Sequence, residues 1–337
     1  WTEATQDLAE AQGGLKVLAS KGIHIVVPKE RLNGDVGFIL QTEKSVLFII
    51  PWERYWVIGT TDTPYHQDFT HPVASQADID YVIDHANVVL QKPITRDDVI
   101  GTWAGLRPLL QPATKGDGTA STKVSREHTV TEAAPGLVTI AGGKLTTYRV
   151  MAQDAVDFAL GEADAKARPS QTKHTPLMGA AGYRALSAQA DTLGREFGWD
   201  GTRVRHLLDR YGSEINTLIA QCREQADLAE PVEHAPDYLR AEFAYGCTHE
   251  GALHLEDLLV NRTRLTYEIA DSGLAALPEI AEIAAEKLGW DDARRAAEIA
   301  AYTERVEAER AAATQPDDAS AAEARSAAPE VVDAVKG

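Results

Sequence analysis

The chain has 337 residues, of which 44% are hydrophobic and 25% charged, as is ordinary for a globular protein, and this length predicts about two domains. The formal net charge of −18 argues against a general nucleic-acid-binding role, because binding a phosphate backbone needs a basic face. No apolar run approaches the ~20 residues of a membrane-spanning helix, and the two cysteines, Cys222 and Cys247, lack metal-ligand and redox spacing, so we expect neither a spanning helix nor a metal site.

The first half of the chain predicts an antiparallel sheet with one helix. Short runs rich in β-branched and aromatic residues, bounded by Gly or Pro, are typical of strands and occur at 22–28, 37–41, 45–51 and 55–59. The short link between the last two runs indicates an antiparallel meander. Residues 75–90 follow as an amphipathic helix with its N-cap at Ser75. His24 alternates with two isoleucines in the first run, and a histidine in such a place is ordinarily a packed or surface residue.

Two segments of this half place polar side chains beside apolar strands. Residues 60–62 leave a strand as a turn in which Asp62 caps backbone N–H groups. Arg107 stands among leucines in a strand predicted over 99–110. Because an unpaired buried guanidinium is costly, this arginine either reaches the surface, forms an internal ion pair or binds an anion.

A glycine turn joins a strand predicted at 137–141 to the helix that follows it. Gly142 and Gly143 let a ligand or another backbone approach closely, because they carry no Cβ. The N–H groups and the positive dipole end of the helix, together with Lys144 and two following threonines, favour negative charge at this turn. The alternative is an ordinary strand-to-helix turn with a threonine N-cap.

The composition changes at about residue 161. Residues 161–176 read as a polar linker, and 177–310 predict helices because apolar residues recur at three- and four-residue spacing. Beyond 310 the chain is rich in Ala, Asp and Glu with few large apolar residues, so 311–337 predict a disordered tail.

The segment GGKLTTYRVMA, Gly142 to Ala152, resembles the C-terminal signature of the FAD-dependent glycerol-3-phosphate dehydrogenases, the respiratory type that passes electrons to quinone. The resemblance runs from about Trp1 to Leu160 through the HIVVP, GTTD and G-x-R-P blocks, and more loosely to Tyr267. It implies an α/β (α+β) fold, in which residues 1–160 form a partial FAD-binding domain with a mostly antiparallel substrate-binding sheet and 177–310 a small all-α C-terminal domain. The G-x-G-x-x-G fingerprint of that family does not occur, so we expect a fragment without the N-terminal nucleotide-binding part.

The resemblance also implies roles for individual residues. His24 and Lys144 are the candidate catalytic residues, His24 as the base and Lys144 as a cation beside the flavin. The substrate phosphate is expected on Arg107 and Arg126, with Lys123 and His128 as alternatives to the second arginine. The residues expected to bind FAD are Thr61, Asp62, Gly142, Gly143, Lys144, Leu145, Thr146 and Thr147.

The implied reaction is oxidation of sn-glycerol 3-phosphate to dihydroxyacetone phosphate, with FAD as cofactor and a quinone as electron acceptor. The family further implies a homodimer and a cytoplasmic location, peripheral on the inner face of the cytoplasmic membrane. Two alternatives stay open: an amine or amino-acid oxidase of the same flavoprotein fold, and a non-catalytic fragment or interaction module. Two arginines aimed at one dianion argue against the first alternative.

Overall fold

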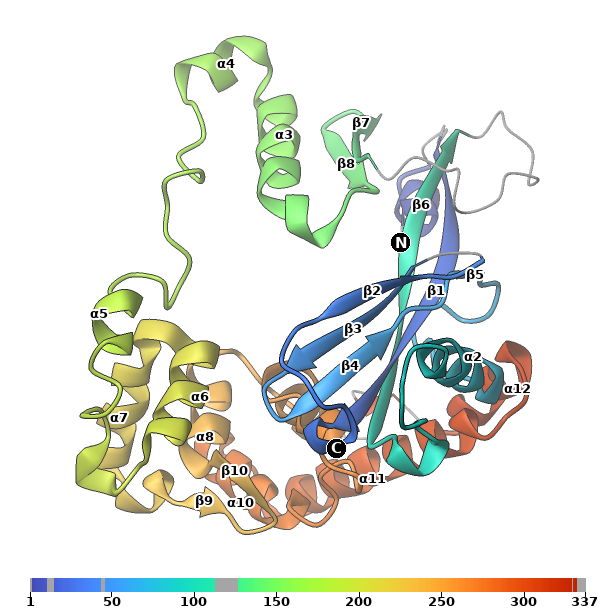
Figure 1. Ribbon diagram of the computed structural model, residues 1–337. Coiled ribbons are helices and arrows are strands. Elements are labelled where there is room, and N and C mark those ends of the chain that lie inside the picture. The colour runs from blue at the N-terminus through green and yellow to red at the C-terminus, as the bar shows by residue number, and fades with distance from the viewer. Residues whose placement is uncertain (1, 11–14, 44–45, 113–126, 329, 332–337) are drawn as a thin grey trace.

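An antiparallel sheet forms the centre of the first half of the chain (Figure 1). The structure is a computed structural model that describes residues 2–10, 15–43, 46–112, 127–328 and 330–331. The sheet has six strands in the order β2-β3-β4-β1, with β5 and β6 also paired to β1. A helix, α1 (Thr2–Leu8), precedes the strands β1 (Leu15–Pro28), β2 (Phe38–Gln41), β3 (Val46–Trp52), β4 (Tyr55–Gly59), β5 (Thr63–Pro64) and β6 (Gly101–Pro112). The predicted antiparallel sheet is therefore confirmed.

One face of the sheet is buried by α2 (Gln76–Asn87). Ile23, Ile25 and Val27 of β1 are fully buried, and they pack in one cluster with Ile79 and Val82 of the helix. The helix begins with the predicted N-cap, because Ser75 and the third helical residue form a capping box. Since side chains alternate along a strand, the even-numbered residues of β1 face the other way. This opposite face carries the candidate site.

A separate small unit follows the sheet. It consists of the hairpin β7 (Thr129–Ala134) and β8 (Leu137–Ala141), a 3-10 turn, η4 (Leu145–Thr147), and the helices α3 (Tyr148–Leu160) and α4 (Glu162–Ala167). Figure 1 shows this unit at the end of β6, with a long link from α4 to the helical domain. No residue of α3 is buried, and Val156 and Phe158 are 57% and 48% exposed. This helix therefore packs on little within the described residues.

The second half of the chain is mainly helical, as predicted. Its core includes Leu207, Phe243 and Ile280, all fully buried. The elements are α5 (Tyr183–Ser187), α6 (Gly201–Tyr211), α7 (Ile215–Glu224), β9 (Pro231–Val232), β10 (Ala235–Leu239), α8 (Arg240–His249), a π-helical turn η8 (Asp257–Arg262), α9 (Leu265–Glu268) and α10 (Leu277–Leu288). The sequence did not predict the short antiparallel pair β9–β10.

The predicted disordered tail is wrong for residues 311–325. The helix α11 (Asp292–Ala313) is followed by α12 (Asp318–Arg325), and α11 connects the helical domain to the α2 side of the sheet (Figure 1). Ala312 and Ala321 are fully buried, because their small side chains let the two helices pack closely against each other and against the residues before α2. Asp318 also forms an ion pair with the fully buried Lys21 of β1. Partners from a distant part of the sequence order this segment.

None of the helices found in the described parts of the chain combines the length and the apolar character needed to cross a membrane.

Candidate functional site

The candidate site lies on the face of the sheet opposite α2. In the β1–β6 pair, Ser20 lies opposite Arg107, Gly22 opposite Gly105, and His24 opposite Trp103. Because these positions are two residues apart on each strand, all six residues share one face. Two of the sequence candidates, His24 and Arg107, therefore lie on the same face of one strand pair.

The Arg107 side chain turns back over β1 and is held by the residues that follow β4. Its Nη1 donates to the carbonyl oxygen of Thr61 at 3.1 Å, and its Nη2 donates to Oγ1 of Thr60 at 3.1 Å. A Cβ on Gly22 would lie 2.5 Å from Nη2, so the guanidinium occupies the space that a side chain there would fill. The guanidinium thus lies about 7 Å along β1 from His24, two residues away.

His24 is a neutral imidazole with an unused ring nitrogen. Its ring stacks on Trp103, with 5.1 Å between the ring centroids and 20° between the planes. Burial, and secondly the charge of Arg107, lower the pKa of His24 from 6.5 to about 4. Nδ1 is buried and has no hydrogen-bond partner among the described residues. At neutral pH the ring therefore has a nitrogen lone pair that can accept a proton, as a base requires.

Thr61 and Asp62 support this arrangement from the end of β4. Thr61 is 2% exposed, and its Oγ1 accepts from the backbone N–H of Ile23 at 3.1 Å. Asp62 accepts from the hydroxyl of Ser20 and lies 3.8 Å from Nη1 of Arg107. Both residues hold the turn against β1, and their predicted contact with a cofactor stays a prediction.

The glycine turn lies at the far end of β6 from His24. Gly142 and Gly143 have φ angles of +80° and +78°, which only glycine adopts readily, and a Cβ on Gly142 would lie 2.7 Å from Cδ1 of Leu110. Leu110 is three residues beyond Arg107, about 10 Å along the strand. Lys144, the next residue of the turn, is exposed. The structure therefore brings the glycine turn to one end of β6, while His24 and Arg107 lie farther along the β1–β6 pair.

A 3-10 turn separates the glycine turn from the helix that follows it. Leu145, Thr146 and Thr147 form a 3-10 turn, and α3 starts at Tyr148. The backbone N–H of Lys144 donates to Oγ1 of Thr147 at 3.2 Å, and this hydroxyl donates back to the carbonyl of Lys144 at 2.9 Å. All four residues from Lys144 to Thr147 are exposed, so the turn is open to a ligand.

The second predicted arginine cannot be placed. Arg126 and its alternative Lys123 lie outside the described residues. The other alternative, His128, has its Nε2 at 2.8 Å from Oδ2 of Asp154, so it joins the start of β7 to α3. In the part of the chain that the structure describes, no group of three or more His, Cys, Asp or Glu side chains could hold a metal ion.

Known proteins resemble this chain over nearly its whole length. Residues 1–149 match the family model described as FAD dependent oxidoreductase, and residues 170–295 match the C-terminal domain of alpha-glycerophosphate oxidase. The chain is 49% identical to glycerol-3-phosphate dehydrogenase 2 of Mycobacterium tuberculosis, and 47% identical to the glycerol-3-phosphate dehydrogenase of Mycobacterium leprae. Each of these matches covers 98% of this chain and 56% of the relative. The chain belongs to the FAD-dependent glycerol-3-phosphate dehydrogenase family.

A solved structure agrees with this membership. The crystal structure of the glycerol-3-phosphate dehydrogenase from Bacillus halodurans complexed with FAD superposes with a TM-score of 0.76 at 27% identity. The match covers 91% of this chain and 60% of that one. This chain of the dehydrogenase family therefore spans a little over half the length of the relatives that it matches.

Sequence reasoning missed three residues of the candidate site. Trp103 supports the ring of His24, while Gly22 leaves room for the guanidinium of Arg107. A Cβ on Gly105 would meet no heavy atom within 4 Å, so the floor between Trp103 and Arg107 is open. The two-residue spacing of Trp103, Gly105 and Arg107 in one predicted strand was the signal that could have found them.

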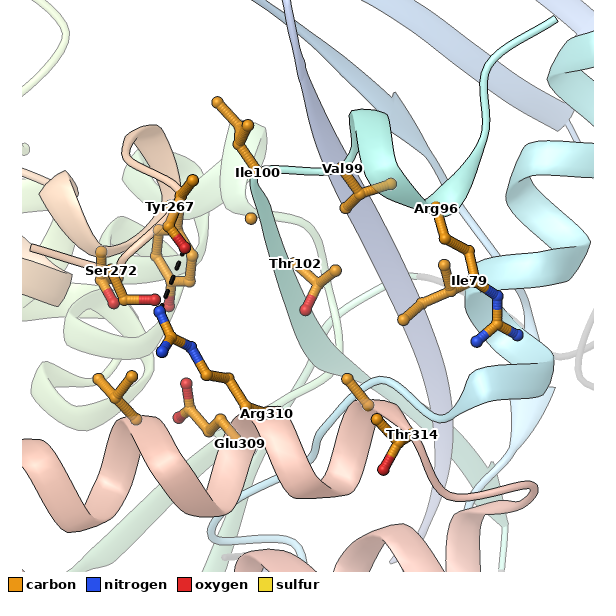
Figure 2. Close-up of a pocket in the computed structure, with 15 residues that line it drawn as sticks. Ile79, Arg96, Val99, Ile100, Thr102, Tyr267, Ser272, Glu309, Arg310 and Thr314 are labelled. Carbon is orange, nitrogen blue, oxygen red and sulfur yellow. Dashed lines mark hydrogen bonds between the residues drawn. The ribbon is translucent and has the colours of Figure 1, made fainter.

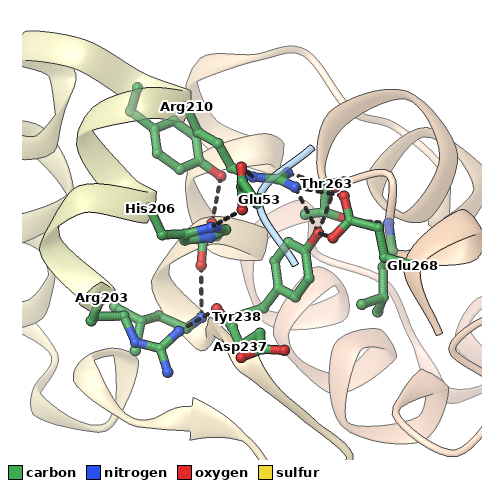
Figure 3. A network of polar contacts seen from close by, with 12 residues as sticks. Glu53, Arg203, His206, Arg210, Asp237, Tyr238, Thr263 and Glu268 are labelled. Carbon is green, nitrogen blue, oxygen red and sulfur yellow. Dashed lines mark hydrogen bonds and ion pairs between the residues drawn. The ribbon is translucent and has the colours of Figure 1, made fainter. Parts of the chain in front are cut away.

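A buried network of polar contacts joins the sheet to the helical domain (Figure 3). His206 of α6 lies between two carboxylates, with Nδ1 at 3.1 Å from Glu53 in the β3–β4 turn and Nε2 at 3.0 Å from Glu242 of α8. Beside it, Arg210 donates to the Tyr238 hydroxyl at 2.8 Å and to Glu268 at 2.9 Å. The β4 strand that leads to residues 60–62 is thereby anchored at its start.

Proposed function

We propose that this chain supplies the substrate-binding sheet and the helical domain of an FAD-dependent dehydrogenase that oxidises sn-glycerol 3-phosphate to dihydroxyacetone phosphate. One observation carries the proposal: a neutral His24 with an unpartnered Nδ1 among the described residues lies on the same sheet face as the guanidinium of Arg107. A base and a fixed cation at this separation suit a substrate with a hydroxyl at one end and a phosphate at the other.

The residues present fit FAD. The open floor at Gly105 leaves room above the sheet for a planar ring, and the buried Nδ1 of His24 lacks a hydrogen-bond partner in the described part of the chain. The turn from Gly142 to Thr147 would hold the cofactor through its backbone, because its two glycines permit a close approach and its following residues are exposed. Thr61 and Asp62 would support the ring from the other side of the site.

Bound FAD would supply the acceptor for the hydride that leaves C2 of the substrate. His24 takes the proton of the C2 hydroxyl, and its neutral state at pH 7 makes it able to do so. Arg107 binds the phosphate, and the support that it receives from residues 60 and 61 and from the space at Gly22 keeps it in place. Arg126 would be the second phosphate ligand, and Lys144 would balance negative charge near the cofactor.

We further propose that a quinone reoxidises the cofactor and that the protein works as a homodimer at the inner face of the cytoplasmic membrane. Family membership supports these points. The sheet face opposite α2 also supports an apolar contact with a membrane or a second copy of the chain. On this face Ile39, Ile50 and Trp52 are 63%, 43% and 38% exposed.

The first test is an absorbance spectrum of the purified chain with added FAD, before and after sn-glycerol 3-phosphate. The flavin bands are expected to bleach with this substrate and to stay unchanged with glycerol, because glycerol lacks the phosphate that Arg107 binds. Bleaching by an amine or an amino acid would instead favour the oxidase alternative.

Substrate binding is tested separately by tryptophan fluorescence, since Trp103 stacks on His24. Replacing Arg107 by Lys is expected to weaken binding of sn-glycerol 3-phosphate, because a single ammonium cannot make the two contacts of a guanidinium. Arg96→Lys is the matched control, since Arg96 pairs with Asp80 away from this face. If Arg107→Lys binds the substrate as tightly as the control, Arg107 does not bind the phosphate.

A further inference from the structure

A polar cavity lies beside the edge strand β6, between the loop before α2 and the helices α11 and α12. Its volume is about 280 Å³, and its lining includes two arginines, two carboxylates, a histidine and a tryptophan: Arg305, Arg325, Glu256, Glu309, His71 and Trp103. It is separate from the Arg107 guanidinium, which is not part of this lining.

Arg325 is buried without the partners that a buried guanidinium needs. The residue is 4% exposed, and its Nε is buried without a hydrogen-bond partner in the described part of the chain. The carboxylate paired with it is Glu309, whose Oε1 lies 3.7 Å from Nε. That oxygen already accepts from Nε of Arg305 at 2.8 Å. Because burial of a cation without hydrogen bonds is costly, the Nε side of Arg325 is only partly compensated by Glu309.

The two arginines of the cavity differ in how well they are compensated. Arg305 lies 2.6 Å from Glu256 as well as 2.8 Å from Glu309. Burial alone would lower the pKa of Arg305, but these carboxylates raise it above its ordinary value. For Arg325, burial and the charge of Arg305 lower the pKa, and the carboxylates of Glu309, Glu256 and Glu330 offset the effect only in part. Within this cavity, nearby carboxylates therefore compensate the buried charge of Arg325 less than that of Arg305.

We propose that Arg325, together with Arg305, binds a small oxyanion of the phosphate class in this cavity. A phosphate oxygen pair matches the two parallel N–H groups of a guanidinium, and one phosphate can bridge two arginines. The volume exceeds that of a bare phosphate, so a small phosphate ester also fits. The ligand's source is thus either free phosphate or the phosphate group of a metabolite.

One side chain, Trp103, connects this anion site to the candidate active site. Trp103 lines the cavity and also stacks on His24. A bound anion would therefore change the surroundings of Trp103. The binding itself is independent of the proposed oxidation, and it is measured without cofactor or turnover.

The test is isothermal titration calorimetry of inorganic phosphate into the full chain in a phosphate-free buffer. Arg107→Gln serves as the background, so that phosphate binding at the candidate active site does not contribute. In this background the chain is expected to bind phosphate, and adding Arg325→Gln is expected to weaken binding roughly ten- to hundredfold, because charge-assisted hydrogen bonds are lost.

Arg310→Gln is the matched control. Arg310 also belongs to α11 and lines the neighbouring cavity of about 360 Å³ shown in Figure 2, where it donates to the carbonyl of Ala270 at 3.2 Å. Its replacement is expected to leave phosphate affinity unchanged. Glu309→Gln is expected to tighten binding, because it removes a carboxylate that competes for both arginines of the anion site.

Further titrations identify the source of the oxyanion. Tighter binding of sn-glycerol 3-phosphate than of inorganic phosphate would indicate a phosphate ester, and the reverse would indicate free phosphate. Circular dichroism checks that each variant is folded, and Arg325→Lys, which keeps the charge, is expected to bind phosphate more tightly than Arg325→Gln. If folded Arg325→Gln binds phosphate as tightly as its parent, or if no binding occurs in the Arg107→Gln background, the anion site does not exist.

Discussion

Replacement of His206 by Gln tests whether a buried charge joins the sheet to the helical domain. His206 is 5% exposed and lies between Glu53 and the fully buried Glu242, with the Arg210 guanidinium nearby (Figure 3). Burial alone would lower the pKa of His206, but the hydrogen bonds to Glu242 and Glu53 raise it from 6.5 to about 9. The protonated imidazole is therefore the form that the fold prefers.

The size of the effect follows from this difference between the folded and unfolded states. A rise from 6.5 to about 9 corresponds to about 3 kcal/mol of stability, at about 1.4 kcal/mol per pKa unit. Because the folded-state pKa is raised, this stability is fully present below about pH 6.5 and is lost as the pH rises through about 9. Near pH 8 somewhat less than half of it remains.

The assay is urea unfolding followed by circular dichroism at about pH 6, 8 and 10. His206→Gln is expected to lower the unfolding free energy by about 3 kcal/mol at the lowest pH and by much less at the highest. His85→Gln is the matched control, because His85 also contacts a carboxylate, Glu43, but at the surface. A difference between wild type and His206→Gln that stays constant over this pH range would refute a role for the protonated imidazole.

Three further substitutions test the packing around the site. Gly22→Ala is expected to weaken binding of sn-glycerol 3-phosphate roughly ten- to hundredfold in a fluorescence titration, because the new Cβ displaces the Arg107 guanidinium; unchanged affinity would contradict that placement. Lys21→Met is expected to lower the unfolding free energy by about 3–5 kcal/mol in urea, because it leaves two carboxylates without their shared buried cation, and a neutral effect would show that the ion pairs are dispensable. Gly142→Ala is expected to cost about 1–2 kcal/mol and to speed hydrogen exchange in β7 and β8, because an alanine at φ +80° would also meet the carbonyl of Glu127; equal exchange rates would argue against this turn geometry.

Local patterns were enough to predict the sheet and its covering helix. The runs at 37–41, 45–51 and 55–59 correspond closely to β2, β3 and β4, since alternation and bounding glycines are local properties. The start of β1 at Leu15 was missed, because this part of the strand includes the polar residues Ser20 and Lys21. That lysine is buried only because Asp78 and Asp318 meet it in the folded chain.

The chemistry of the site could be predicted only in part. The residue types at His24 and Arg107 suggest a base and an anion ligand, and their strands could be read from the sequence. Their common face depends on the register of β1 with β6, which pairs His24 with Trp103 across a long stretch of sequence. The lowered pKa of His24 likewise depends on burial, which no local pattern shows.

The sequence by itself determined which segments become strands and helices, and which glycines permit unusual backbone angles, because these depend on near neighbours. It also carried the family's motifs, from which the cofactor and the substrate class were expected. Only the tertiary structure decided that residues 311–325 are ordered, that Arg107 bends over Gly22, and that Nε of Arg325 is buried without a hydrogen-bond partner among the described residues. These outcomes depend on charges and surfaces from distant parts of the chain. The contacts between them, and the free energy that these contacts contribute, arise only when the chain folds.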